Sequence, residues 1–231
     1  MNLAQQGYCW MRAELLNGGA FSGGRVSLNT LVAQSGLGRT PVRDAVNRLA
    51  AEGLLELVDR SGITVRVPGT EELREMVELR EAIEPYAAEQ AATRIDYVQA
   101  ARLRRLCREM RGVARAIRDA QFSDEAAHQR MRALDWAFHS LILDAAGNQR
   151  LCRIVEDQHL LLHKIRYPSR YTVHHLARTL LEHWRIGQAL ARGDAAAARL
   201  WMWRHARRGG HAMLASSDEN RKAREAKDNE E

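Results

Sequence analysis

The pattern of apolar and polar positions changes character near residue 68, roughly a third of the way along the chain. The first part alternates quickly between short elements. Apolar residues at helical spacing predict helices over residues 4–16 and 27–35, and glycines follow soon after each of them. A third helix is expected to begin at Thr40, which is placed as the N-cap, with Pro41 in the first helical position.

A β-hairpin is predicted directly after the third helix. The apolar stretches LLELV and ITVRV are separated by DRSG, which has the composition of a turn. Three helices followed by a hairpin are typical of a winged helix-turn-helix. Residues 1–68 are therefore predicted to form a DNA-binding domain of this type.

Strand signals vanish from Thr70 onward, and the rest of the chain is predicted to be helical. Six helices are expected, over residues 71–94, 97–118, 124–146, 149–167, 172–192 and 195–214. Residues 69–216 are therefore predicted to form an antiparallel bundle of six to seven helices, which makes the fold class mainly α. The charged segment 217–231 has no apolar residue larger than alanine, so it is predicted to be disordered.

The composition is that of an ordinary globular protein, with 45% hydrophobic and 28% charged residues. No apolar run approaches the roughly 18–20 residues that span a bilayer, and the first residues lack the features of a secretory signal. The three cysteines are widely spaced, which favours reduced thiols and a cytoplasmic location. The net charge of +6 is compatible with a polyanionic partner, but it raises the expectation of nucleic-acid binding only modestly.

The first turn of the third predicted helix carries side chains that can read DNA. Arg39, Thr40 and Arg43 are placed there, where an arginine can grip a guanine edge and a threonine can bind a phosphate. Arg48 points near the side that would contact the DNA backbone. The hairpin turn Arg60-Ser61-Gly62 can reach a phosphate or a minor groove. The alternative interpretation is an ordinary small helical domain with surface arginines.

A helix in the second part carries two ionisable residues beside its apolar face. In the stretch LDWAFHSLILDAAGN, Asp135 and His139 are four residues apart and so lie one above the other. Burying such groups is costly unless something pairs with them. His183 lies ten residues before the expected turn at 193–194 and His205 eleven after it, which places both at the same height on antiparallel helices. Three imidazoles and one carboxylate suit Zn²⁺, Ni²⁺ or Mn²⁺.

A second pair of histidines competes for this role. His159 and His163 are also four residues apart on a predicted helix, so they too could share a metal ion. Most histidines in proteins are ordinary core or surface residues, and this chain has nine of them. The spacing alone therefore leaves three alternatives open, namely either histidine set or no metal site.

A family resemblance extends over nearly the whole chain except the charged tail. The segment GRTPVRDAVNRLAAEGLL, followed by SGITVRVP, resembles the DNA-binding domain of the GntR transcription regulators. The stretches LREAIEPYAAEQAA, DWAFHSLILDAAGN and EHWRIGQALARGDAAAA, with a later RH, resemble the all-helical FCD domain of the FadR-type branch. This resemblance implies that Arg39, Thr40 and Arg43 contact bases and phosphates, and that Gly62 lies at the tip of the wing.

Two positions depart from the family pattern in the DNA-binding segment. Gly38 stands where many members have a serine, which removes a possible hydroxyl contact with DNA. Asn29 stands where some members carry an arginine that contacts DNA. The preferred DNA sequence is therefore expected to differ from the better-known operators of the family.

The resemblance also favours one of the two histidine sets. FadR-type domains that bind metal use a D-x-x-x-H helix and two later histidines, which correspond here to Asp135, His139, His183 and His205. In that family a small organic acid binds in the same pocket, commonly with the help of an arginine on the first helix of the domain.

Arg80, in the segment ELREAIEP, matches the position of that arginine. A guanidinium can hold a carboxylate through two hydrogen bonds, which suits an organic-acid effector. The alternative for Arg80 is an ion pair on its own helix with Glu84 or Glu81.

The function expected from these observations is that of a metabolite-responsive transcription regulator, a repressor that acts as a homodimer on operator DNA. No enzymatic activity is expected. One alternative is a helical-bundle metalloenzyme acting on a small carboxylate, but no obvious general base lies beside the metal set, and Glu182 is the only carboxylate nearby in sequence. Another alternative is an architectural DNA-binding protein without a ligand, which leaves the four candidate metal ligands without a role.

Overall fold

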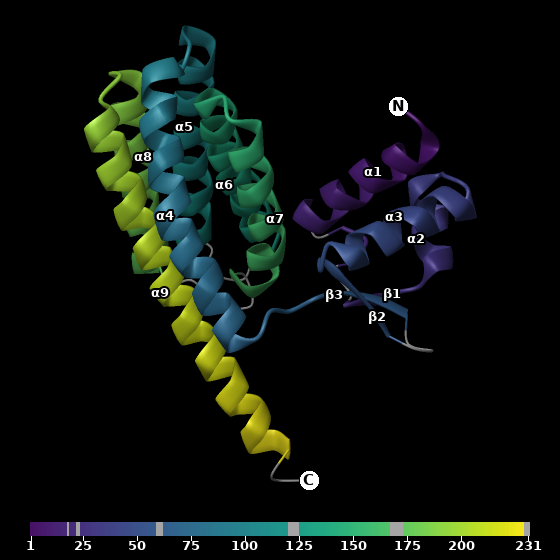
Figure 1. Ribbon diagram of the computed structural model, residues 1–231. Coiled ribbons are helices and arrows are strands. Elements are labelled where there is room, and N and C mark those ends of the chain that lie inside the picture. Colours follow the sequence, from purple (N-terminus) through teal and green to yellow (C-terminus); the bar gives the residue numbers. More distant parts are fainter. Residues whose placement is uncertain (18, 22–23, 59–61, 120–124, 167–172, 229–231) are drawn as a thin grey trace. The chain divides into compact units, whose positions relative to one another are not determined.

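The structure, a computed structural model, describes residues 1–17, 19–21, 24–58, 62–119, 125–166 and 173–228 (Figure 1). The chain divides into two compact units, of which one comprises residues 1–68 and 157–164 and the other residues 69–156 and 165–231. The fold is mainly helical, which confirms the predicted class. A winged helix-turn-helix with a small sheet is followed by a helical bundle.

The first unit has the element order of a winged helix-turn-helix. Its elements are α1 (Leu3–Asn17), β1 (Arg25–Val26), α2 (Leu28–Ser35), α3 (Arg39–Ala51), β2 (Leu55–Val58) and β3 (Gly62–Val65). The strands form an antiparallel sheet in the order β1-β3-β2. The Ser27 side chain accepts a hydrogen bond from the Thr30 backbone N–H at 3.0 Å, and Gly36 follows α2 with a φ of +66°, so the structure confirms both predicted limits of this helix.

Two details of the first unit differ from the prediction. The sequence analysis predicts no strand where β1 forms, because a strand of two residues is too short to show an alternating pattern. The third helix begins earlier than expected, since Gly38 and not Thr40 is the N-cap. Gly38 has an extended backbone, with φ −67° and ψ 162°, and Pro41 then lies in the first turn, where a missing N–H leaves no hydrogen bond unmade.

Six helices follow in the described residues from Thr70 onward, and all of them belong to the second unit except for residues 157–164. They are α4 (Thr70–Arg94), α5 (Tyr97–Asp119), α6 (Glu125–Ala146), α7 (Gln149–Arg166), α8 (Val173–Ala191) and α9 (Ala195–Asp228). Helix α4 packs against α9 and α6, α5 packs against α6 and α8, and α8 packs against α9. Buried alanines on α4 let its neighbours approach closely, and Phe138 of α6 and Leu103 of α5 lie in the centre with no exposed surface.

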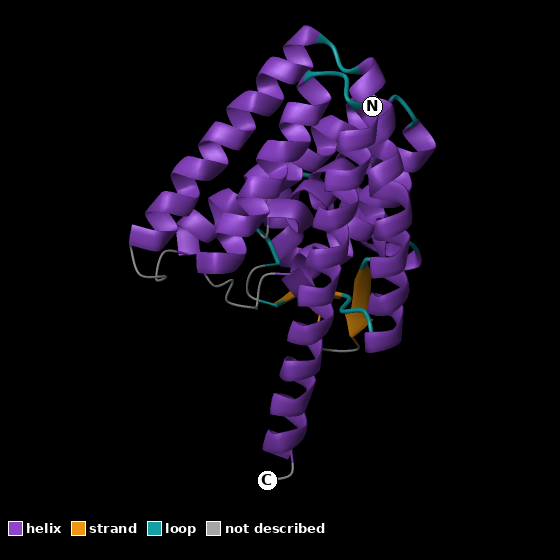
Figure 2. Ribbon diagram, turned by 90° about the vertical axis from the view of Figure 1, so that its left-hand side faces the viewer, coloured by secondary structure: helices purple, strands orange, loops and turns teal. Residues whose placement is uncertain are grey.

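Helix α9 extends further than the sequence predicts (Figure 2). It continues to Asp228 and so includes most of the segment 217–231 that is predicted to be disordered. Alanine, arginine, lysine and glutamate, which make up much of this segment, are all good helix formers. A lack of large apolar residues therefore does not by itself rule out a helix. No helix in the described part of the chain is both long and apolar enough to cross a membrane.

Candidate functional site

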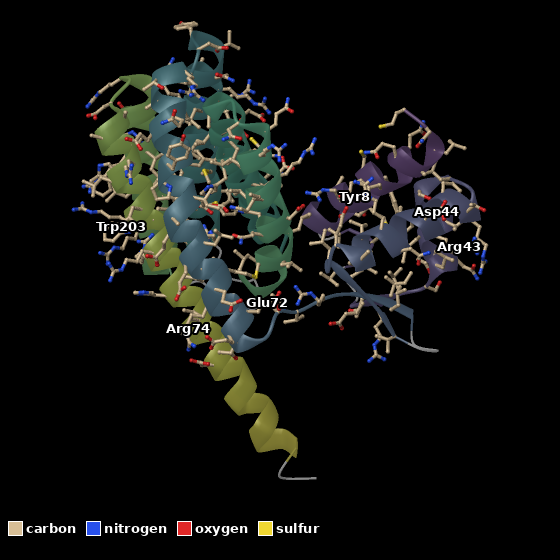
Figure 3. All side chains as sticks on the ribbon, in the orientation of Figure 1. Tyr8, Arg43, Asp44, Glu72, Arg74 and Trp203 are labelled. Atoms are coloured by element: carbon tan, nitrogen blue, oxygen red, sulfur yellow. The ribbon has the colours of Figure 1, made fainter. Side chains whose placement is uncertain are left out.

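The first candidate site is the exposed face of α3. Arg39, Thr40 and Arg43 are exposed at its N-terminal end, as expected for side chains that reach a DNA groove. In Figure 3, Arg43 and the neighbouring Asp44 lie on the outer side of α3. The opposite side of the helix is buried by Val42, Ala45, Val46 and Leu49. The amphipathic pattern of α3 therefore orients its polar face toward solvent.

Asn29 has a role on this surface that the sequence does not reveal. Its Oδ1 accepts a hydrogen bond from Nη1 of Arg39 at 2.6 Å, which joins α2 to the start of α3. A side chain held in this way loses less conformational entropy when it meets a ligand. Asn29 thus stands where some family members have an arginine, and here it positions the neighbouring Arg39.

Arg48 is engaged within the first unit. Its guanidinium lies over the Tyr8 ring at 3.7 Å, and it donates hydrogen bonds to Glu52 at 3.1 Å and to Gln5 at 3.2 Å. The guanidinium joins α1 to α3, and about half of the side chain is exposed. A DNA-backbone contact by Arg48 would have to form in addition to these bonds.

Gly62 is the first residue of β3. Of the predicted wing turn, residues 60 and 61 lie outside the described residues. Gly62 has a φ of +103°, and a Cβ atom at this position would lie 2.8 Å from the Val26 carbonyl oxygen. Both features require glycine for structural reasons alone, independently of any contact with DNA.

The second candidate site is a buried polar cluster in the helical bundle. Helix α6 contributes Asp135 and His139, α8 contributes His183 and α9 contributes His205, and each of these side chains is 7% exposed or less. One nitrogen from each of the three imidazoles lies within 4.8 Å of the others. Asp135 Oδ1 lies 3.4 Å from His183 Nε2 and 4.0 Å from His139 Nε2. The structure thus brings together all four side chains that the sequence predicts as a set.

The helix turn at Gly193 explains why His183 and His205 meet. Gly193 has a φ of +69°, and the Asp194 side chain accepts a hydrogen bond from the Ala197 backbone N–H at 2.9 Å, so α9 begins directly after the turn. The two helices then run alongside each other with equal rise per residue. The imidazole centroids of His183 and His205 consequently lie 4.6 Å apart.

Two further carboxylates, those of Glu182 and Glu84, lie beside imidazoles of this cluster. Glu182 Oε2 lies 3.2 Å from Nδ1 of His205, and Glu84 Oε2 lies 3.8 Å from Nδ1 of His139. A carboxylate on Nδ1 favours the tautomer in which Nε2 can bind a metal ion, so these residues are suited to an outer shell around the site. Burial raises the pKa of the Glu182 carboxyl, while the guanidinium of Arg208, which donates a hydrogen bond to it, opposes the rise.

Arg80 lies next to the cluster, paired with Glu84. Its Nε donates to Glu84 Oε1 at 2.6 Å and its Nη2 donates to Oε2 at 3.3 Å, and only 1% of the residue is exposed. This is the ion pair that the sequence offers as the alternative for Arg80. Because Glu84 also faces His139, the pair connects Arg80 to the histidine cluster.

His159 also approaches the cluster, from helix α7. One ligand atom from each of Glu84, His139 and His159 lies within 4.8 Å of the others, and all three residues are buried. The side chain of His163, the expected partner of His159, lies outside the described residues. Spacing along one helix could not reveal this arrangement, because the partners of His159 come from α4 and α6.

Comparisons with known proteins cover both units. Residues 3–65 match the family model described as bacterial regulatory proteins, gntR family, and residues 75–208 match the model of the FCD domain. The uncharacterized HTH-type transcriptional regulator YdhC of Bacillus subtilis (strain 168) is 27% identical over 201 residues, which are 87% of this chain and 86% of that protein. The probable D-xylose utilization operon transcriptional repressor of Paenarthrobacter nicotinovorans is 35% identical over 124 residues, which are 53% of this chain and 50% of that protein.

Solved structures share the fold at low sequence identity. E. coli McbR/YncC superposes with a TM-score of 0.74 at 20% identity, over 93% of this chain and 98% of that chain. A putative transcriptional regulator GntR from Rhodococcus sp. RHA1 superposes with a TM-score of 0.71, also at 20% identity, over 92% and 97% of the two chains. The arrangement of helices and strands is therefore one that other proteins adopt with quite different side chains.

Proposed function

The chain belongs to the GntR family of bacterial transcription regulators and carries an FCD domain, and we propose that it is a homodimeric repressor controlled by a small organic acid. Members of this family bind DNA and are not enzymes, so the metalloenzyme alternative is set aside. The observation that carries the rest of the proposal is the convergence of Asp135 and three buried histidines beside the Arg80–Glu84 pair.

Arg39, Thr40 and Arg43 are proposed to read the operator. They are exposed at the N-terminal end of α3, and Asn29 holds the guanidinium of Arg39 in place. Two copies of α3 in a homodimer would read half-sites about 34 Å, or one helical turn, apart. Repression is supported by the relative from Paenarthrobacter nicotinovorans, which is named as a probable repressor.

A divalent metal ion is proposed to bind between α6, α8 and α9. Three imidazoles within reach of one another, with a carboxylate beside two of them, are the kinds of ligand that Zn²⁺ and Ni²⁺ prefer, and Mn²⁺ also accepts this mixture. Asp135, His139, His183 and His205 would hold the ion, which would supply a positive charge able to bind a carboxylate. Glu84 and Glu182 would keep the imidazoles of His139 and His205 in the orientation that binding requires.

The organic acid is proposed to bind Arg80 in exchange for Glu84. The cavity beside Glu84 and His139 measures only about 10 Å³, which is too small for any organic acid. An effector therefore enters only when the Arg80–Glu84 pair opens, and its carboxylate then takes the place of Glu84 on the guanidinium. An effector that requires this change of partner binds one state of the bundle better than the other, and such a difference in affinity is what can alter DNA binding.

Selection of bound sequences from a random duplex library tests the DNA-reading part of the proposal. The wild-type protein is expected to enrich a two-fold symmetric site. The Arg43→Ala variant is expected to stay folded but to lose that enrichment, because the guanidinium that reads a base edge is gone. Arg102→Ala, which removes an exposed arginine from α5 in the other unit, is the matched control and is expected to enrich the same site. Unchanged selection by Arg43→Ala would contradict the proposal.

Thermal unfolding of the metal-loaded protein with a panel of small organic acids tests the effector part. A binding acid is expected to raise the melting temperature of the wild type and to lose this effect in Arg80→Met. An acid that stabilises both proteins equally would place the effector elsewhere. The effector is also expected to weaken binding to the selected duplex, and tighter binding would contradict relief of repression by the effector.

A further inference from the structure

A groove of about 560 Å³ lies between α8 and α9, on the surface of the helical unit. Its volume is in the range of small-molecule binding sites. The groove is distinct from the buried cavity beside Glu84 and His139, with which it shares no lining residue. It is lined mainly by arginine and tryptophan side chains.

The lining of this groove is strongly positive. The described lining residues include a single carboxylate, Glu182, against one histidine and five arginines, namely Arg178, Arg185, Arg204, Arg207 and Arg208. Glu182 is only 7% exposed, and its Oε2 is already engaged by Arg208 and by His205 Nδ1. Arg178 and Arg185 also interact electrostatically with this carboxylate, but one negative charge cannot neutralise five arginines. An occupant of the groove must therefore carry several negative charges.

The arginines of the groove are held in place by its tryptophans. The guanidinium of Arg185 lies 4.1 Å and that of Arg204 lies 4.8 Å from the centre of the Trp201 ring. The guanidinium of Arg207 lies 5.1 Å from the centre of the Trp203 ring, and Figure 3 shows Trp203 on the outer side of α9. Stacking on a ring fixes the plane of a guanidinium and leaves its N–H groups directed outward, ready for an oxyanion.

We propose that this groove binds a small molecule that carries two or more phosphate groups. Planar guanidinium groups match phosphate oxygens through paired hydrogen bonds, and a diphosphate supplies enough charge to engage several of them at once. A second copy of this chain is a poor occupant, because a two-fold contact through the groove would place the same arginines against one another. A monocarboxylate is also a poor occupant, because it would neutralise only one of them.

Isothermal titration of the metal-loaded protein with inorganic pyrophosphate tests this proposal. Sulfate at the same ionic strength is the comparison anion. Pyrophosphate is expected to bind with a dissociation constant roughly tenfold or more below that of sulfate, because it can bridge two or more guanidinium groups. The Arg204→Gln/Arg207→Gln variant is expected to lose roughly tenfold or more of this affinity. Arg192→Gln is the matched control, since it removes an exposed arginine from the turn after α8, outside the groove.

The double variant also distinguishes binding in the groove from binding at the metal ion. Pyrophosphate that merely chelates the metal ion would give the same heat in the wild type and in the double variant, and this result would overturn the proposal. Equal affinities for sulfate and pyrophosphate would overturn it as well. Binding of a random-sequence DNA duplex is expected to be unchanged in the double variant. A loss of duplex binding without any loss of pyrophosphate binding would make the groove a nucleic-acid surface.

Discussion

Replacing Arg80 with methionine removes the partner of a buried carboxylate while keeping much of the side-chain volume. Arg80 and Glu84 have side chains that are 1% and 3% exposed, and two hydrogen bonds join them. Removing one member of such a pair leaves an uncompensated charge in the interior, which typically costs about 3–5 kcal/mol. His139 Nδ1 lies 3.8 Å from Glu84 and can offset part of this charge, so the lower end of that range, about 3 kcal/mol, is expected.

Urea unfolding of the metal-free protein measures this loss, and a second substitution shows where it comes from. Arg80→Met should lower the free energy of unfolding by about 3 kcal/mol and the melting temperature by roughly 6–12 °C. Arg80→Met/Glu84→Leu should recover at least about half of the loss, because the buried carboxylate that lost Arg80 is then removed as well. A loss of stability below about 1 kcal/mol in Arg80→Met, or no recovery of stability in the double variant, would contradict the idea that Arg80 offsets the cost of burying the Glu84 carboxylate.

Three further predictions concern other parts of the chain. Cys9 is exposed, whereas burial raises the pKa of the Cys107 thiol to about 11. At pH 8 a thiol reagent added to the native protein should therefore react rapidly with Cys9 and slowly with Cys107. Equal reaction rates of the two thiols would contradict this prediction. Gly62→Ala should destabilise the first unit by about 1–3 kcal/mol, because the φ of +103° and the Val26 carbonyl oxygen 2.8 Å away both oppose a Cβ atom. Gly112→Ala, in a helix with open space around it, should instead stabilise the protein by about 0.5–1 kcal/mol in the same unfolding assay.

The helices can be predicted from sequence because local signals mark their ends. Ser27 and Gly36 limit α2 through a side-chain hydrogen bond and a positive φ, both of which depend on residue type. The strand β1 cannot be predicted in this way, because it exists only through pairing with β3. The predicted N-cap of α3 is wrong because Thr40 has the chemistry of a cap, whereas Gly38 caps the helix with its backbone conformation alone.

Part of the buried cluster is open to prediction for a similar reason. His183 and His205 can be paired from sequence because they lie almost equally far along the chain from the connection between their helices at residues 193–194. Asp135 and His139 can be paired because they are four residues apart on one helix. The contacts of His159 with Glu84 and His139 depend on how separate helices pack, which no local pattern records. In sequence Asn29 is only a departure from the family pattern, and its hydrogen bond to Arg39 becomes visible in the structure.

Elemental analysis of the purified protein is the sharpest test of the proposed metal site. The wild type should contain one divalent metal ion per chain, His183→Ala/His205→Ala should contain none, and His159→Ala should retain the ion. This result is expected because the three imidazoles of the predicted set lie within reach of one another, and Asp135 Oδ1 lies close to those of His183 and His139. A full complement of metal in His183→Ala/His205→Ala, together with its loss in His159→Ala, would contradict the proposed site and assign the ion to Glu84, His139 and His159.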